Sequence, residues 1–420
     1  MKVGYMFAGV GSVRLAFEYD CAGYSNDTGW VWNKRENSPW DFCWTNQYEP
    51  PIKKDRNTQH AYEIYVNHFG YEGTVNADIV KYLDHNELFD IKVPDSLDLL
   101  VAGFPCQDFS VVNKTRKGIE GVKGEMWWQV HRVIDQTRPR FVLLENVDNL
   151  IHNPKSKKGR DFAVLLASLR DIGYNVEWRI YRASDAGAST SRKRIYIIAT
   201  TDNVWKNSRF FFDESMPGVS TFYDFQEIGE DILEVSQTGG FHFEPVGRMI
   251  DGRVENYRFR PAPLPSITLG DILQDFDVAV GHSPHIVIAD EKLDFSDQPA
   301  DKTWQKVKGN LNFPDPLDQP CRTLLTKCLE AHPARENIVV AQDRGGADIN
   351  QKSTEHTGLV YRLLTPIEAE RAMTFPDNWT KHSVDREVPR FHRGFVMGNS
   401  CPPLILEKIR RSLESLILPS

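Results

Sequence analysis

The segment best suited to covalent chemistry is Gly103-Phe104-Pro105-Cys106-Gln107-Asp108-Phe109-Ser110, which follows the apolar run 99–102. A thiol after such a run is predicted to lie at the carboxyl end of a central strand, the edge at which open α/β sheets carry their chemistry. Pro105 stiffens the loop, Gly103 allows a close approach to a ligand, and polar neighbours replace the apolar ones that usually surround a structural cysteine. Cys106 is therefore a candidate nucleophile.

Two further polar segments are predicted at the same edge. Glu145-Asn146-Val147 ends the apolar run 141–144, so Glu145 is a candidate acid one strand away from the thiol, although a lone Glu there could also cap a helix. Ser191-Arg192-Lys193-Arg194 precedes the apolar run 195–199. It could hold a phosphate or orient a carboxylate, with a solvated basic turn as the alternative.

A glycine loop, Phe7-Ala8-Gly9-Val10-Gly11-Ser12, lies between the first predicted strand and the first helix. Such loops let the backbone approach a ligand, but a plain strand-to-helix turn has the same composition. Arg14 replaces the third glycine of the dinucleotide fingerprint, which favours a smaller nucleoside ligand over NAD. Gln47 and Tyr48 could bind a ribose and stack on an adenine, or form a surface turn. Asp78-Ile79 could contact the adenine edge, or Asp78 could cap a helix.

The elements that position these segments alternate along the first 200 residues, which is the pattern of an open, doubly wound, mostly parallel α/β sheet. Strands are predicted at 3–7, 42–46, 97–102, 141–144, 176–181 and 194–200, and helices at 12–19, 60–69, 125–136 and 160–172. After residue 200, Pro and Gly increase and the helical period fades, which predicts a second, smaller strand-and-loop region before a helical tail at 365–372 and 402–418. The Trp-rich stretch 27–43 is predicted to be an inserted loop, to which the sequence assigns no function.

Composition excludes several other classes of protein. The chain has 420 residues, of which 40% are hydrophobic, so it can bury a core, and it has no apolar run long enough to span a membrane. Its first residues lack a secretory signal, so an intracellular protein is expected. The six cysteines (21, 43, 106, 321, 328 and 401) fit neither a disulfide framework nor metal-ligand spacing, so no metal is expected. The net charge of −8 restricts any polyanion site to a local basic face.

Taken in order, these segments resemble the motifs of the DNA (cytosine-5)-methyltransferase family, of the bacterial or phage restriction-modification type. Two later segments also match: Arg362 to Ala369 with Thr374 to Asp377, and Gly398-Asn399-Ser400. The resemblance implies a Rossmann-like, S-adenosylmethionine-dependent methyltransferase sheet in a catalytic domain at 1–204. It also implies a target-recognition domain at 205–355 and a segment at 356–420 that returns to the catalytic domain.

The resemblance also implies roles for individual residues. Cys106 is the nucleophile, Glu145 binds and protonates the cytosine ring, and Arg192 and Arg194 lie near the flipped nucleotide. The positions that match the S-adenosylmethionine pocket are Phe7, Gly9, Gly11, Gln47, Tyr48, Asp78, Ile79, Gly103, Pro105, Met126, Asn399 and Ser400. Two positions depart from the pattern, since the family usually has Glu at Gln47 and often has Gln at Thr190.

The function implied is S-adenosylmethionine-dependent methylation of carbon 5 of a flipped-out cytosine in a specific duplex DNA sequence. The implied partner is double-stranded DNA, together with a cognate restriction endonuclease that acts on the same site without direct contact. The enzyme is expected to be a cytoplasmic monomer that is nucleoid-associated when bound to DNA.

DNA contacts are predicted in two places. The Gly- and Ser-containing stretch 110–124 carries basic residues and reads as a mobile loop that closes over DNA, with Gln107, Ser110, Lys114, Arg116 and Lys117 as candidate contacts. Sequence reading is assigned to 205–355, where the candidates are Arg248, Arg253, Arg258, Arg260, Lys327 and the run 323–326.

Three other functions fit parts of the pattern. An RNA cytosine-5 methyltransferase would share the core, but the long variable segment favours duplex DNA. A non-catalytic DNA-binding module on the same fold would have no need of Cys106, Glu145 and Arg192. An NAD-dependent oxidoreductase is disfavoured by the missing third glycine and by Gln47 as a poor acceptor for a ribose hydroxyl.

Overall fold

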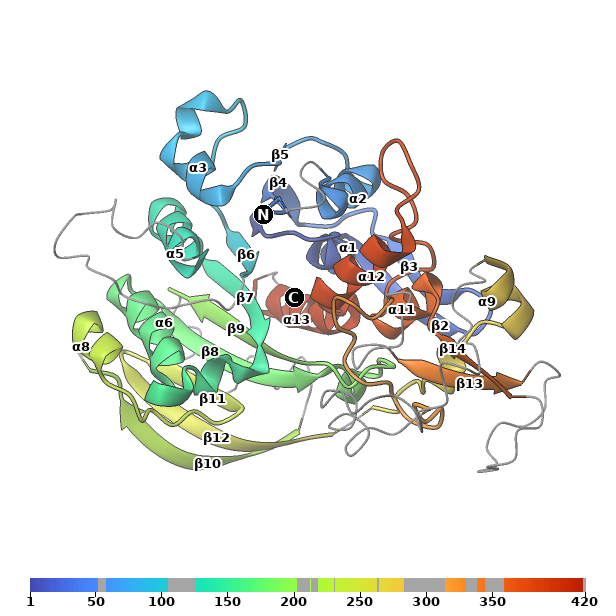
Figure 1. The fold of residues 1–420 in the computed structure, drawn as a ribbon. Helices are drawn as coiled ribbons and strands as arrows, with labels where there is room; N and C mark the ends of the chain where they lie inside the picture. Colours follow the sequence, from blue (N-terminus) through green and yellow to red (C-terminus); the bar gives the residue numbers. More distant parts are fainter. Residues whose placement is uncertain are drawn as a thin grey trace, which may run out of the picture.

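The structure is a computed structural model, shown in Figure 1. It describes residues 1–51, 58–104, 126–201, 212, 218–229, 231–262, 264–282, 314–329, 338–343 and 359–417. None of the helices in these ranges has both the length and the apolar composition that crossing a membrane requires.

Ten strands of the described ranges form one sheet, in the order β10-β12-β11-β8-β9-β7-β6-β1-β4-β5. Its parallel half comprises β1 (Lys2–Met6), β4 (Asp41–Asn46), β5 (Thr74–Val75), β6 (Leu99–Gly103) and β7 (Phe141–Val147). The antiparallel strands β9 (Lys193–Thr200) and β8 (Asn175–Arg182) continue it beyond β7. None of the predicted strand ranges covers the two-residue β5. The predicted strands match the others within a few residues, because near-continuous apolar runs are typical of strands that are covered on both faces.

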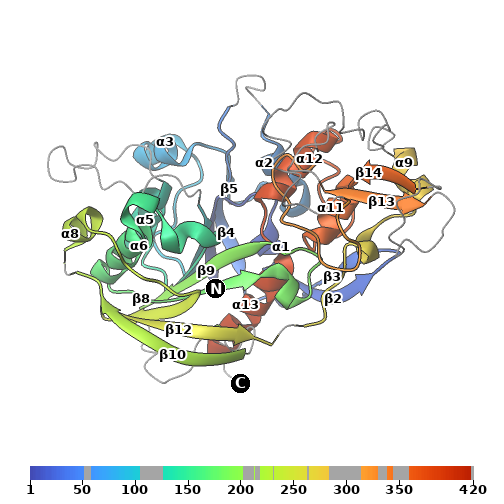
Figure 2. The ribbon, with the colours of Figure 1, turned by 60° about the horizontal axis from the view of Figure 1, so that its bottom comes forward.

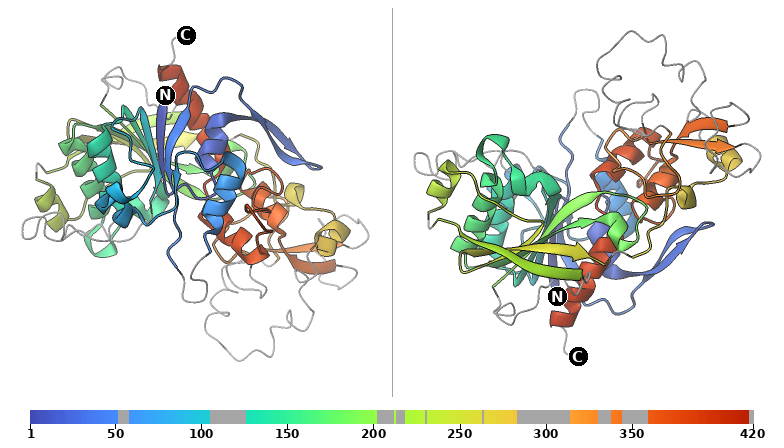
Figure 3. Two further views of the ribbon diagram at one scale, coloured as in Figure 1. Left: turned by 90° about the horizontal axis from the view of Figure 1, so that it is seen from above. Right: turned by 90° about the horizontal axis from the view of Figure 1, so that it is seen from below.

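Helices cover both faces of the sheet, as Figure 3 shows, so the predicted doubly wound α/β class is confirmed. Along β6, for example, Leu100 packs on the face covered by α3, α5 and α6, and Leu99 packs on the face covered by α1, α2 and α13. The helices are α1 (Ser12–Glu18), α2 (His60–Phe69), α3 (Ile79–Asp84), α5 (Met126–Thr137), α6 (Arg160–Asp171), α8 (Ile232–Gln237), α9 (Phe276–His282), α11 (Pro366–Ala372), α12 (Arg390–Asn399) and α13 (Pro403–Ile417).

The sheet continues past the predicted domain boundary at residue 204. The strands β10 (Gly218–Glu227), β11 (Val246–Ile250) and β12 (Arg253–Pro261) pair antiparallel with one another, and β11 pairs with β8. A separate pair, β13 (Val339–Asp343) with β14 (Leu359–Leu363), lies beside α9 and α11, away from β10–β12 (Figure 2). Pro and Gly content marked where loops become frequent, but it carries no information about which sheet a strand joins.

The Trp-rich stretch is not an inserted loop, which corrects the interpretation of 27–43. Most of it belongs to a hairpin of β2 (Tyr19–Ser25) and β3 (Gly29–Lys34) and to the start of β4. The indole N–H of Trp30 donates to the carbonyl of Arg371 at 2.8 Å, and that of Trp32 donates to the carbonyl of Thr374 at 3.1 Å. The tryptophans therefore fasten the hairpin to the C-terminal segment.

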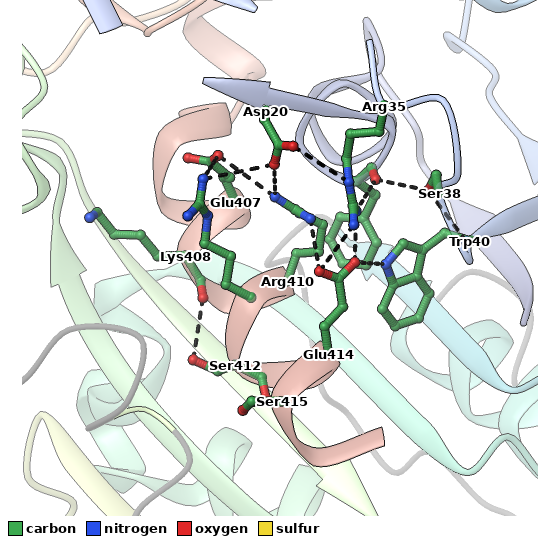
Figure 4. A network of polar contacts seen from close by, with 12 residues as sticks. Asp20, Arg35, Ser38, Trp40, Glu407, Lys408, Arg410, Ser412, Glu414 and Ser415 are labelled. Atoms are coloured by element: carbon green, nitrogen blue, oxygen red, sulfur yellow. Dashed lines mark hydrogen bonds and ion pairs between the residues drawn. The ribbon is translucent and has the colours of Figure 1, made fainter. Parts of the chain in front are cut away.

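A buried ion-pair network fastens the last helix to the N-terminal part of the chain (Figure 4). The side chain of Arg410 on α13 is 2% exposed and pairs with Asp20, Glu407 and Glu414. Glu414 also accepts hydrogen bonds from Arg35 and from the indole N–H of Trp40, both at 2.7 Å. Because α13 also packs against α1, the two ends of the chain share one layer of the catalytic fold.

This network predicts unequal effects for two adjacent arginines. Arg410→Ala leaves three carboxylates close together without their buried cation, so it should lower the free energy of unfolding by about 3–5 kcal/mol. Arg411→Ala removes ion pairs to Asp20 and Glu407 from a side chain that is 59% exposed, so it should cost less than about 1 kcal/mol. Urea denaturation of the two variants measures both values, and equal losses would contradict the role of burial.

Candidate active site

Several candidate residues lie at one edge of the sheet, where the parallel strands end. The register places Met6 beside both Asn46 and Ala102, and Gly103 beside Glu145. The residues that follow these strands therefore emerge next to one another. This edge brings together the glycine loop, Gln47, the start of the cysteine loop and the Glu-Asn-Val segment, as the sequence predicts.

An ion pair joins Glu145 to the basic segment. Glu145 lies on β7 and Arg194 on β9, and the antiparallel register places Arg194 opposite Val147, two residues along β7 and on the same face. Nε of Arg194 lies 3.0 Å from Oε1 of Glu145, and both side chains are largely buried. The pair orients the carboxyl group beside Gly103, where an added Cβ would lie 3.5 Å from Oε2 of Glu145.

The buried amide of Asn146 fixes the start of the cysteine loop. Its Nδ2 donates to the carbonyl of Phe104 at 2.9 Å. Sequence reasoning quoted this residue within its motif but assigned it no role, and its place beside Glu145 was the available signal. The predicted site residues that lie outside the described ranges are Pro105, Cys106, Gln107, Ser110, Lys114, Arg116 and Lys117.

Arg192 is buried, with 2% of its surface exposed. Within the part of the chain that the structure describes, the Arg192 side chain has one hydrogen-bond partner, the carbonyl of Leu324, which accepts from Nη1 at 3.2 Å. Nε of Arg192 has no partner there. Burial, assisted by repulsion from Arg194, lowers the pKa of the Arg192 guanidinium to about 10, while Glu145 acts in the opposite direction. The group remains a cation at neutral pH, with one buried N–H that has no partner among the described residues.

A second thiol, Cys401, lies close to these charged groups. Burial raises its pKa to about 12, and the nearby Glu145 carboxylate acts in the same direction. The Ser12 hydroxyl, at the start of α1, hydrogen-bonds this thiol. The thiol that follows Asn399 and Ser400 therefore contacts the start of α1, next to the glycine loop, although sequence reasoning did not single out Cys401.

The glycine loop has the backbone that its composition requires. Gly9 and Gly11 adopt positive φ values of 57° and 89°, and Phe7 does so at 56°. An added Cβ on Gly11 would lie 2.4 Å from the Phe69 ring, so glycine is required there by packing, whereas an added Cβ on Gly9 would have no atom within 4 Å. The loop is therefore open at Gly9, which leaves room for a ligand.

Gln47 closes against this loop. Its side-chain oxygen accepts a hydrogen bond from the backbone N–H of Gly9 at 2.7 Å, and Gln47 is buried. Tyr48 beside it is half-buried. Asp78 caps α3, since its Oδ1 accepts from the N–H groups of Val80 and Lys81, and Ile79 is buried in the core.

The remaining pocket candidates come from two helix ends. Met126 begins α5 and packs against the core beside the parallel strands. Asn399 ends α12 and is exposed, whereas the buried Ser400 donates its hydroxyl hydrogen bond to the carbonyl of Val396. The carbonyl of Val10 in the glycine loop accepts from the indole N–H of Trp379 at 3.0 Å, which ties this C-terminal segment to the pocket.

The candidate DNA contacts separate into two groups. Arg258 and Arg260 lie on β12, and β11, β8 and β9 lie between that strand and β7, so they are not brought next to Glu145. The run 323–326 instead lies directly against Arg192, through the carbonyl of Leu324. Arg248 forms an ion pair with Glu255 at 2.6 Å.

Comparisons with known proteins identify the family of the chain. The model of the C-5 cytosine-specific DNA methylase family matches residues 1–415. The chain is 31% identical to the Type II methyltransferase M.Sau3AI of Staphylococcus aureus, over 99% of this chain and 96% of that protein. It is 24% identical to the Type II methyltransferase M.BanI of Aneurinibacillus aneurinilyticus, over 98% and 96% of the two chains.

Solved structures confirm the fold. The Entamoeba histolytica methyltransferase EhMeth has a TM-score of 0.55 at 14% identity, covering 100% of this chain and 99% of that chain. The S. pombe Dnmt2 methyltransferase has a TM-score of 0.53 at 15% identity, with both chains fully covered. With the family match across nearly the whole sequence, the conclusion is direct: this chain belongs to the C-5 cytosine-specific DNA methylase family and is a DNA (cytosine-5)-methyltransferase.

Proposed function

We propose that this enzyme methylates carbon 5 of a cytosine that is flipped out of a specific duplex DNA sequence, through a covalent bond between Cys106 and carbon 6. The observation that carries the proposal is the Glu145–Arg194 ion pair, held beside Gly103 at the strand end that leads into the cysteine loop. A paired base cannot reach groups at this edge, so the cytosine must leave the stack, at a cost of a few kcal/mol.

The residues divide the chemistry between them. Carbon 5 of cytosine is a poor nucleophile, and the addition of the Cys106 thiolate to carbon 6 moves ring electrons toward carbon 5. Glu145 gives a proton or a strong hydrogen bond to ring nitrogen 3, which makes that addition feasible. After methylation, water removes the proton from carbon 5, the sulfur–carbon bond breaks, and the proton on nitrogen 3 returns to Glu145. Arg194 orients the Glu145 carboxyl group throughout, and Arg192 supplies positive charge for the thiolate.

The pocket fits S-adenosylmethionine as the methyl donor. Gly9 is open to a ligand, and Gln47 is anchored beside it by the Gly9 N–H, so its amide is positioned at the end of β4 where a ribose is expected. Tyr48 follows directly and offers a ring for the adenine. When bound, this cofactor supplies an activated methyl group on a sulfonium.

Duplex DNA is the proposed partner, bound by a monomer. M.Sau3AI and M.BanI are Type II methyltransferases, which supports a role in restriction-modification, in which an endonuclease acts on the same DNA site without touching this protein.

The other thiols of the described chain are poor alternatives to Cys106. Burial raises the pKa of Cys401, Cys321 and Cys328 to about 12 in each case and that of Cys21 to about 11, and it also raises the pKa of Cys43. At pH 8 a thiol with a pKa of 12 is a thiolate in about one molecule in 10,000. Cys401 therefore lies near Glu145 without being a nucleophile.

This difference predicts the alkylation pattern. Iodoacetamide at pH 8 should modify Cys106 at least about 100-fold faster than Cys401, since only the thiolate reacts. Peptide mass spectrometry of the native protein measures both rates, with urea-unfolded protein as the control. Equal rates in the native protein would remove Cys106 from the proposed role.

Bisulfite sequencing of DNA from cells that express the protein tests the proposed reaction directly. Wild type should protect cytosine in one sequence context, and Cys106→Ser should abolish protection. Glu145→Gln should slow single-turnover methylation by about 100-fold to 10,000-fold, because it removes the ring-protonating acid. Methylation of tRNA without methylation of duplex DNA would overturn the proposal, as would activity that survives Cys106→Ser.

Gln47→Glu provides a separate test of the cofactor pocket. A carboxylate would keep the acceptor for the Gly9 N–H and add a second acceptor for the ribose hydroxyls. We expect S-adenosylmethionine to bind about 5-fold to 10-fold more tightly, as for one added charge-assisted hydrogen bond. Isothermal titration calorimetry measures the change, and weaker binding would show that Gln47 does not face the ribose.

A further inference from the structure

The segment 319–329 lies beside residues 189–192, immediately before the start of β9. Its Cys321 forms an isolated parallel bridge with Thr190. The carbonyl of Cys321 accepts from both the backbone N–H and the hydroxyl of Ser191, at 2.8 and 3.0 Å, and the carbonyl of Arg322 accepts from the Thr190 hydroxyl at 3.3 Å. Residues 190–191 and 321–322, which are far apart in the sequence, are thus joined by hydrogen bonds immediately before Arg192.

The same segment holds the catalytic guanidinium. Three residues after Cys321, the carbonyl of Leu324 accepts from Nη1 of Arg192. A buried cation needs such an acceptor, because loss of a hydrogen bond to a charged group leaves its desolvation uncompensated. The position of the Arg192 side chain therefore depends on where the backbone of segment 319–329 lies.

Helix α12 supports this segment from the opposite side. An added Cβ on Gly398 would lie 2.5 Å from the backbone of Leu325 and Thr326, and one on Gly394 would lie 2.8 Å from Leu329. Such close approach leaves the segment no room to move toward α12. The segment is therefore held between residues 189–192 and helix α12.

The outer side of the segment faces solvent. Leu325 is 45% exposed and Lys327 is also exposed, while Leu324, Cys328 and Leu329 are buried. An exposed apolar side chain and a basic one therefore lie on the same short segment as the acceptor of Arg192, which suits a contact with DNA. A DNA contact on this side acts on the same backbone that carries the Leu324 carbonyl.

We propose that segment 319–329 couples DNA recognition to catalysis, with Thr190 and Ser191 as positioning residues that act through the Leu324 carbonyl on Arg192. The proposal rests on the proposed function, in which Arg192 serves the reaction. DNA seated against the outer side of the segment holds the guanidinium in place, and DNA that does not seat leaves Arg192 without a fixed position. Recognition and rate are then linked by one short stretch of backbone.

The double variant Thr190→Val with Ser191→Ala tests the coupling, because it removes two side-chain hydrogen bonds to the segment and keeps side-chain size. The single-turnover methylation rate should fall about 10-fold, as for two neutral hydrogen bonds, while the dissociation constants for DNA and S-adenosylmethionine change less than about 2-fold, within the error of such measurements. The single variant Ser191→Thr keeps a hydroxyl at both positions and should retain the wild-type rate.

Ser189→Ala is the matched control. Its hydroxyl lies on the same stretch but donates to the carbonyl of Thr268 at 2.9 Å, so its loss should leave the rate within about 2-fold of wild type, the range expected without a coupling term. An equal rate loss in Ser189→Ala, or an unchanged rate in the double variant, would overturn the proposal.

The rate at which phenylglyoxal labels Arg192, measured by peptide mass spectrometry, tests the position of this side chain independently of enzyme activity. The buried guanidinium should be protected in wild type and in Ser189→Ala, and labelled about 10-fold faster in the double variant, in line with the same two hydrogen bonds. Equal protection in the double variant would contradict the coupling. Inactive wild type with this labelling difference would instead contradict the proposed function while leaving the positioning role supported.

Discussion

The ion pair between Glu145 and Arg194 is the contact around which the candidate active site is arranged. It crosses from the last parallel strand, β7, to the antiparallel strand β9, so it forms only when that pairing is in register. A slip of one residue would send one of the two side chains to the other face of the sheet. The same register sets Gly103 beside the carboxyl group on the opposite side of β7. Register, more than the properties of any one side chain, therefore defines the geometry of the site.

The C-terminal segment completes the site by reaching back to the first residues of the chain. The indole N–H of Trp379 donates to the carbonyl of Val10, and the Ser12 hydroxyl hydrogen-bonds the Cys401 thiol, so two C-terminal residues contact the chain where the glycine loop leads into α1. The buried pairing of Arg410 with Asp20 and Glu414 anchors the last helix over the same layer. Desolvating these charges is costly, and that cost is offset only when all partners are present. The cofactor side is thus coupled to correct folding of the whole chain.

Two arginines near Glu145 differ in how their positive charges are matched. Arg194 is matched by Glu145, while Arg192 is more deeply buried and retains an unpaired N–H beside its single described acceptor, the carbonyl of Leu324. A buried cation that is incompletely satisfied raises the free energy of the free enzyme, and a ligand that meets the remaining N–H recovers it. This arrangement favours binding of a group that carries an acceptor, such as a pyrimidine carbonyl or a loop carbonyl.

The sequence by itself determined the parallel strands, helix α2, and the motifs at the strand ends, because apolar runs, helical spacing and glycine turns are local signals. Only the tertiary structure decided that β10–β12 join the same sheet, and that the Trp-rich stretch is a hairpin fastened through Trp30 and Trp32. It also decided that Leu324, which lies 132 positions from Arg192, supplies the acceptor for that side chain. Such contacts depend on backbone groups and on strand pairing between distant segments, and neither leaves a trace in residue type or spacing.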